Sequence, residues 1–206
     1  MKPYHLNHKF IKDSNFILRD IFNNDENINL LKSFIEEILN IKILKILQRN
    51  SLEEKIKYFY PDNIKGICDI KALTEKNEEI NIGIQIIDGE YIQEKILIYG
   101  ALIHGNQNLD ESDVHKSKTI TINILDFEYF STIEYHKKIQ IYEEYMVFHV
   151  IELPKFKKSN IETEEEAWIA YFKADSIEMI EKSKKKSAKV KELDNALNNY
   201  WMNERL

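Results

Sequence analysis

The segment KTITINILDF, residues 118–127, limits the possible folds more than any other part of the chain. It is a continuous run rich in β-branched residues, which is typical of a strand buried on both faces of a sheet. The preceding segment, 89–107, has the spacing of apolar residues that predicts a helix. Before it, residues 66–88 predict two strands joined by a charged turn. A helix between a hairpin and a buried strand indicates a crossover, and therefore a mixed sheet with helices on both faces.

Further helices and strands are predicted on both sides of this unit. Asp13 and Ser14 are candidate caps of an N-terminal helical region, in which apolar residues recur at helical spacing. The Ile-rich segment 41–49 and the segment 143–154, which ends at a proline, are predicted strands. From about residue 162 the chain is predicted to be helical to its end. The predicted order is therefore helices, strand, hairpin, helix, strand, strand and helices.

The composition is ordinary for a globular chain of 206 residues, with 43% hydrophobic and 31% charged residues. No stretch approaches the ~20 apolar residues of a membrane helix. The first residues, MKPYHLNHKF, lack the apolar core of a signal peptide, so we expect a cytoplasmic protein. The single Cys68 rules out an internal disulfide and any multi-cysteine zinc site. The net charge of −6 is mildly unfavourable for binding nucleic acid but does not exclude it, because a basic face can coexist with an acidic one.

The hairpin carries polar residues among isoleucines. Strand side chains alternate between the two faces, so Asp69 and Lys71 share one face of the first strand, and Asn81, Gly83 and Gln85 share one face of the second. The turn brings Asp69 roughly opposite positions 83 to 85, and the two polar faces are then expected to coincide. From spacing alone two interpretations stay open, an acid at a sheet edge in contact with water and a metal ligand.

Seven motifs spread over most of the chain are similar to those of a known family. They are FILRDIF, LLKSFIEEIL, CDIKALTEKNEEINIGIQ, GEYIQEKILIYG, TITINILDF, YHKKIQI and FHVIELPKF. The last two strands and the ending ELPKF are the most specific part. On these motifs the chain resembles the PD-(D/E)XK nuclease family transposases, also called recombination-promoting nucleases. The resemblance implies an α/β, restriction-endonuclease-like core, in which helices flank a mixed sheet.

The expected domain organisation follows from the same resemblance. We expect a nuclease-like domain over residues 1–156 and a helical C-terminal extension over residues 157–206. The extension would pack on the core or mediate oligomerisation, and a homodimer is a reasonable expectation for a nuclease that must cut two strands. DNA is the implied partner, and no membrane association is expected.

The resemblance also implies a metal site on the hairpin. Hydrolysis of a phosphodiester needs a hard cation, Mg²⁺ or Mn²⁺, that carboxylates hold beside the scissile phosphate. By position, Asp69 matches the first metal ligand of the family and Gln85 matches the final polar residue of its second strand. Lys71 is a candidate catalytic lysine, or else it neutralises Asp69. Gly83 stands where the family has a glutamate, and glycine supplies no ligand.

Three explanations of Gly83 remain open. In the first, the site has decayed and the fold survives as a binding module. In the second, the carboxylate comes from the following helix, from Glu94 or, less favourably, Glu90. In the third, the residue was changed deliberately to silence a toxic nuclease, and glycine is an unusual choice for that. The first is favoured, because Glu94 lies next to Lys95 and could equally form a surface ion pair.

Candidate DNA contacts have structural alternatives of their own. Lys95 is a candidate phosphate contact, and a solvated helix lysine is the equal alternative. Tyr91 and Tyr99 share its helical stripe and could stack on nucleotides, although packing against the sheet is favoured. The lysine run at 182–191 is interpreted first as a solvated helix face and second as a DNA contact.

Two functions follow from the sequence. The first is a metal-dependent DNA endonuclease of the recombination-promoting type, with a degenerate active site. Its expected catalytic residues are Asp69, Gln85 and Lys71. Its expected metal ligands are Asp69 and Glu94, and its expected DNA contacts are Lys95 and Tyr91. The second function is a catalytically inactive relative that binds DNA or a partner protein.

Overall fold

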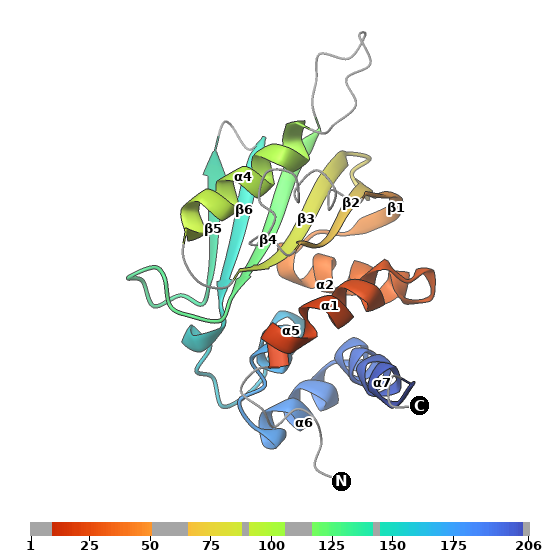
Figure 1. Ribbon diagram of the computed structural model, residues 1–206, viewed down its shortest axis with the longest axis vertical. Helices are drawn as coiled ribbons and strands as arrows, with labels where there is room; N and C mark the ends of the chain where they lie inside the picture. Colours follow the sequence, from red (N-terminus) through yellow and green to blue (C-terminus); the bar gives the residue numbers. More distant parts are fainter. Residues whose placement is uncertain (1–9, 51–65, 88–90, 106–116, 142–144, 204–206) are drawn as a thin grey trace. The chain divides into compact units, whose positions relative to one another are not determined.

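The described part of the chain forms six strands and several helices (Figure 1). A computed structural model describes the chain over residues 10–50, 66–87, 91–105, 117–141 and 145–203. The chain divides into two compact units: a sheet unit of residues 41–125 and 136–151, and a helical unit of residues 1–40, 126–135 and 152–206. No helix among the described residues is long and apolar enough to cross a membrane.

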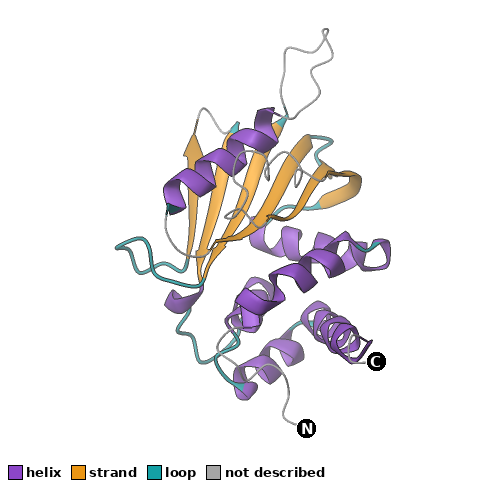
Figure 2. Cartoon of the chain, viewed as in Figure 1, coloured by secondary structure: helices purple, strands orange, loops and turns teal. Residues whose placement is uncertain are grey.

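The sheet is mixed, with strand order β1-β2-β3-β4-β6-β5. The strands are β1 (Ile43–Asn50), β2 (Gly66–Thr74), β3 (Glu79–Ile87), β4 (Lys118–Leu125), β5 (His136–Ile141) and β6 (Met146–Glu152). Strand β2 is antiparallel to β1 and β3, β3 is parallel to β4, and β5 is antiparallel to β6. Helix α4 (Ile92–Gly105) connects β3 to β4 and lies along one face of the sheet (Figure 2). The predicted crossover, the mixed sheet and the α/β fold class are confirmed.

Helix α4 covers the polar face of strands β3 and β4. Gly83 lies directly beneath the helix, and its parallel partner in β4 is Thr121. Lys95, Tyr99 and Ile103 follow one another at four-residue intervals on α4 and are all buried, because that spacing places side chains on one side of a helix. The isoleucines at even positions of β3, from Ile80 to Ile86, point to the opposite face by strand alternation.

The helical unit contains helices from both ends of the chain. They are α1 (Phe10–Asn23), η2 (Asp25–Asn27), α2 (Ile28–Leu39), η3 (Leu153–Lys155), α5 (Glu164–Lys173), α6 (Ile177–Lys186) and α7 (Ala188–Asn203). Its core is aromatic: the ring of Phe34 packs edge-on against Trp168 and Phe172, with centroids 5.4 Å apart in each pair. Helix α5 begins with a capping box, in which Thr163 and Glu166 bond each other's backbone amides.

Two predictions about elements are wrong. Asp13 and Ser14 lie inside α1 and do not cap it, because Phe10 and Ile11 already continue the apolar pattern upstream. The predicted order also lacks one strand, β5, which lies at the edge of the sheet. Its residues are half-buried or exposed, so the strand lacks the alternation of apolar and polar residues that identifies a half-buried strand.

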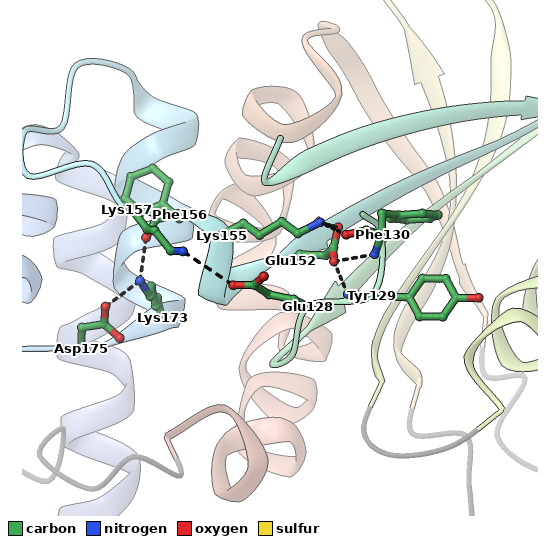
Figure 3. A network of polar contacts seen from close by, with 9 residues as sticks. All are labelled: Glu128, Tyr129, Phe130, Glu152, Lys155, Phe156, Lys157, Lys173 and Asp175. Atoms are coloured by element: carbon green, nitrogen blue, oxygen red, sulfur yellow. Dashed lines mark hydrogen bonds and ion pairs between the residues drawn. The ribbon is translucent and has the colours of Figure 1, made fainter. Parts of the chain in front are cut away.

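A buried ion pair holds the segment between β4 and β5 in place (Figure 3). Glu152 and Lys155, whose side chains are 1% and 5% exposed, are 2.7 Å apart at Oε2 and Nζ. The other oxygen of Glu152 accepts hydrogen bonds from the backbone amides of Tyr129 and Phe130. Lys155 Nζ donates to the carbonyl of Phe130 at 2.6 Å. The motif ELPKF therefore has a structural role, since its acid and its lysine together bind one loop.

Candidate active site

Asp69 and Gly83 are direct partners across the hairpin. Strand β2 pairs with β3 so that the Cα atoms of Asp69 and Gly83 are opposite each other, which confirms the register predicted from the sequence. Asp69 is only 7% exposed. A buried carboxylate needs hydrogen bonds or a cation to compensate for the loss of water, so its neighbours decide what the site can hold.

Tyr99 of helix α4 supplies a hydrogen bond to that carboxylate. Its hydroxyl lies 2.5 Å from Asp69 Oδ1, 3.2 Å from the carbonyl of Ile84 and 3.4 Å from the carbonyl of Cys68. Burial, then the charge of Asp69 and the hydrogen bond to it, raise the pKa of Tyr99 well above its ordinary value. The phenol therefore stays protonated and donates to Asp69. Burial, with Asp69 as the second cause, also raises the pKa of the Cys68 thiol, so this thiol is neutral beside Asp69.

The space above Gly83 is filled by α4. A Cβ atom built on Gly83 would overlap Cδ1 of Ile103 and would lie 2.8 Å from Cε1 and 3.0 Å from the hydroxyl of Tyr99. Contacts this short are essentially not found for real Cβ atoms. A larger residue here would need Ile103 and the ring of Tyr99 to move, so glycine suits the close approach of the helix.

Gln85 lies on the same face as Gly83, but its side chain bonds toward β4 and not toward Asp69 on β2. Its side-chain amide donates to Asn123 Oδ1 at 2.5 Å, and Gln85 is 1% exposed. Asn123 in turn donates to Thr121 Oγ1 at 2.9 Å and to the carbonyl of His149 at 3.0 Å. The predicted polar residue of the second strand thus belongs to a buried amide chain that runs across β3, β4 and β6.

The other candidate site residues have surroundings of their own. Lys71 forms an ion pair with Glu79 at 2.5 Å, with both side chains partly exposed. Glu94 is exposed on α4, one residue before the buried Lys95, so Lys95 is not the solvated helix lysine of the alternative interpretation. Tyr91 is 69% exposed and precedes the helix. Glu90, the other candidate source of a carboxylate, lies outside the described residues.

The described residues do not fit a divalent cation at Asp69. Carboxylate and other oxygen ligands must point at one position for such a cation to bind. Here Asp69 Oδ1 is taken by the Tyr99 hydroxyl, and Gly83 has neither a carboxylate nor space for one. Within the part of the chain that the structure describes, no three His, Cys, Asp or Glu side chains are grouped so that they could hold a metal ion.

A mixed sheet with helix α4 on one face and an acid on its β2–β3 hairpin is consistent with the restriction-endonuclease-like fold, and this defines the class of the protein. The profile of the PD-(D/E)XK nuclease family transposases matches residues 12–206, and the chain belongs to this family. PD-(D/E)XK nucleases generally use a divalent metal. Comparisons with curated proteins and with solved structures found no match.

Sequence reasoning assigned no role at the site to Ile103 and Asn123, and it left Tyr99 as a packing residue. The sequence contained one indication for helix α4 and one for strand β4. Lys95, Tyr99 and Ile103 have the four-residue spacing of a single helix face. In β4 the polar residues Thr119, Thr121 and Asn123 alternate with isoleucines, which indicates one polar face, and the strand is buried on both faces as predicted.

Proposed function

We propose that this chain is a DNA-binding member of its family that does not hydrolyse DNA at the hairpin site. The observation that carries the proposal is the hydrogen bond from Tyr99 to Asp69, together with the filled space over Gly83. Of the two functions expected from the sequence, the inactive relative is therefore the one that the geometry favours.

Among the described residues, the site offers one carboxylate to a cation. Hydrolysis of a phosphodiester needs a cation that polarises the phosphoryl oxygens and activates a water molecule. Asp69 is the carboxylate that could begin such a site, and a neutral phenol faces it where a cation would need access. Lys71, the candidate catalytic lysine, is directed to Glu79 in an ion pair. No side chain that is described beside Asp69 offers the second carboxylate.

DNA remains the expected partner because membership of the family implies it. The family assignment covers residues 12–206 and includes the helical C-terminal region. A fold that no longer hydrolyses DNA can keep its binding surface, since that surface consists of residues away from the reacting atoms. A homodimer through residues 157–206 stays a prediction, and light scattering of the purified protein tests it.

The proposal is tested with one protein and two assays. Fluorescence anisotropy with a labelled duplex measures binding, and supercoiled plasmid with Mg²⁺ or Mn²⁺ measures nicking. We expect salt-sensitive binding and no nicking above the level of Asp69→Asn, a variant that reports contaminating nucleases. Nicking by the natural chain that Asp69→Asn abolishes would overturn the proposal. Absence of binding to any duplex would also overturn it and would leave a protein-binding module.

A further inference from the structure

We infer that the Tyr99 hydroxyl, and not a metal ion, is a partner of the Asp69 carboxylate in this chain, and that Gly83 belongs to this arrangement because it makes room for Tyr99. The hairpin site is thus a joint between α4 and the sheet. The inference shares one assumption with the proposed function, namely that Asp69 holds no cation. It goes further, because it assigns a role to Tyr99, Ile103 and Gly83 and predicts which changes would rebuild a metal site.

The side chains of α4 fill the space over Gly83. Nothing about the backbone requires glycine at position 83, since it lies in a regular strand and outside the left-handed region. What requires it is the approach of α4, because the ring of Tyr99 and the end of Ile103 occupy the volume of the missing side chain. Both residues are buried, at 0% and 6% exposure. The helix and the strand are therefore complementary in shape at this position.

Hydrogen bonding supports the same arrangement. A metal ion would compensate a buried carboxylate by charge, and a phenol contributes a strong hydrogen bond to it. The Tyr99 hydroxyl is held between Asp69 Oδ1 and the carbonyl of Ile84, at 2.5 and 3.2 Å. These two acceptors belong to neighbouring strands, β2 and β3. The one hydroxyl proton is donated to Asp69 at the shorter distance, which ties α4 to β2, and the Ile84 carbonyl of β3 is the weaker second acceptor.

If this arrangement excludes a cation, a metal site at the hairpin needs three substitutions. Restoring glutamate with Gly83→Glu alone would force a side chain into filled space and would leave the Tyr99 hydroxyl on Asp69. A site for a cation needs two further changes. Ile103→Val removes Cδ1, the atom that overlaps a Cβ on residue 83, and Tyr99→Leu removes both the hydroxyl and Cε1. The triple variant then presents two carboxylates on adjacent strands to one vacated volume.

Thermal unfolding in MnCl₂ or MgCl₂ tests the inference without any cleavage assay, because a ligand that binds only the folded state raises the unfolding midpoint. We expect no metal-dependent rise for the natural chain or for Gly83→Glu. For Gly83→Glu/Tyr99→Leu/Ile103→Val we expect a rise that grows with Mn²⁺ concentration and disappears when Asp69→Asn is added. A folded triple variant that shows no rise would overturn the inference and leave the proposed function standing. A rise in the natural chain that Asp69→Asn removes would overturn both.

A second measurement tests the inference even if the triple variant does not fold. Tyr99→Phe deletes only the hydroxyl, and we expect it to lower the unfolding midpoint by several degrees in the natural background and by much less in the Asp69→Leu background. The matched control is Tyr171→Phe, since Tyr171 donates to Asp194 at 2.8 Å in a second buried phenol–carboxylate pair. Its effect should be the same with and without Asp69→Leu. An unchanged midpoint in Tyr99→Phe would contradict the role assigned to the hydroxyl.

Discussion

At the scale of single residues, the site is defined by how the side chains of Tyr99 and Ile103 pack over Gly83, which has no side chain. Gly83 contributes no atoms beyond its backbone, and Ile103 and Tyr99 fill the space that results. A residue that looks like an absent ligand in the sequence is thus a packing requirement in the fold. At this scale we predict the stability of a variant at Gly83 and the effect of the buried His149 on the pH dependence of stability.

The variant Gly83→Ala should destabilise the protein by about 1–3 kcal/mol, which is the usual effect of inserting a methyl group into a filled core. The added Cβ would overlap Ile103 Cδ1, so Ile103→Val should recover part of the stability. Chemical denaturation measures both. The control is Gly105→Ala, where a Cβ meets no atom within 4 Å. Equal effects at positions 83 and 105 would contradict the packing argument.

His149 should make the stability depend on pH. Its ring nitrogen lies 2.8 Å from that of His136. Burial, and then the charges of His136, Lys138 and Lys118, lower the pKa of His149 from 6.5 to about 3. Between these values the unfolded chain binds more protons than the folded one. The free energy of unfolding should therefore fall as the pH falls from 6.5 towards 3, by up to about 1.4 kcal/mol per pH unit.

Denaturant titrations at pH 7 and pH 5 measure this dependence, and His149→Gln should reduce it. The matched control is His104→Gln, which removes a histidine that lies 3.0 Å from Thr119 Oγ1. A His149 imidazole that protonates near its ordinary pKa in an NMR titration of the folded protein would contradict the prediction.

The sequence predicted part of the site at this scale. The pairing of Asp69 with Gly83 could be predicted because strand alternation and a short turn fix the register. The hydrogen bond from Tyr99 could not, because it depends on how closely α4 approaches the sheet. That distance is set by Gly83, Ile103 and their neighbours together, and no periodicity in a single element contains it.

At the scale of elements, the buried pair of Glu152 and Lys155 connects the end of β6 to the loop before β5. Most elements were predicted correctly, since long apolar patterns identify α2, β3 and β4 from local sequence alone. Strand β5 was missed for a physical reason. It is held at the edge of the sheet by backbone bonds to β6, and backbone bonding leaves no pattern in the side chains.

Lys155→Met should lower the free energy of unfolding by about 3–5 kcal/mol, since it leaves the buried carboxylate of Glu152 without its cation. The amides of Tyr129 and Phe130, which donate to Glu152, should then exchange their hydrogens faster in native-state exchange. The control is Lys157→Ala, because Lys157 and Glu128 are exposed and 3.8 Å apart. We expect less than about 1 kcal/mol for it. Similar destabilisation in the two variants would contradict the structural role of the buried pair.

At the scale of the whole molecule, the lysines of α6 and α7 divide into two groups. Lys182 and Lys189 are paired with Glu178 and Glu192. Other lysines in this run are exposed and have no ionic partner among the described residues: Lys185, Lys186 and Lys191. Cations without an internal partner are the ones free to approach phosphate, and each phosphate that they neutralise adds to the salt dependence of binding.

Changing Lys185, Lys186 and Lys191 together to glutamine should weaken duplex binding uniformly across sequences. It should also reduce the slope of log affinity against log salt by about 1 for each phosphate that the variant no longer neutralises. Anisotropy titrations at several salt concentrations measure the slope. The matched control changes Lys182 and Lys189 to glutamine, and its slope should stay close to that of the natural chain. A larger effect in the control would place the DNA elsewhere.

The closeness of α4 to Gly83 also limits which single substitutions this chain tolerates. A glutamate introduced at position 83 would meet the side chains of Tyr99 and Ile103 and would lower stability before any catalytic advantage could appear. A second carboxylate beside Asp69 would therefore need further substitutions in the helix as well. In evolutionary terms, a metal site at this hairpin cannot be reached by one substitution at position 83 without a loss of stability.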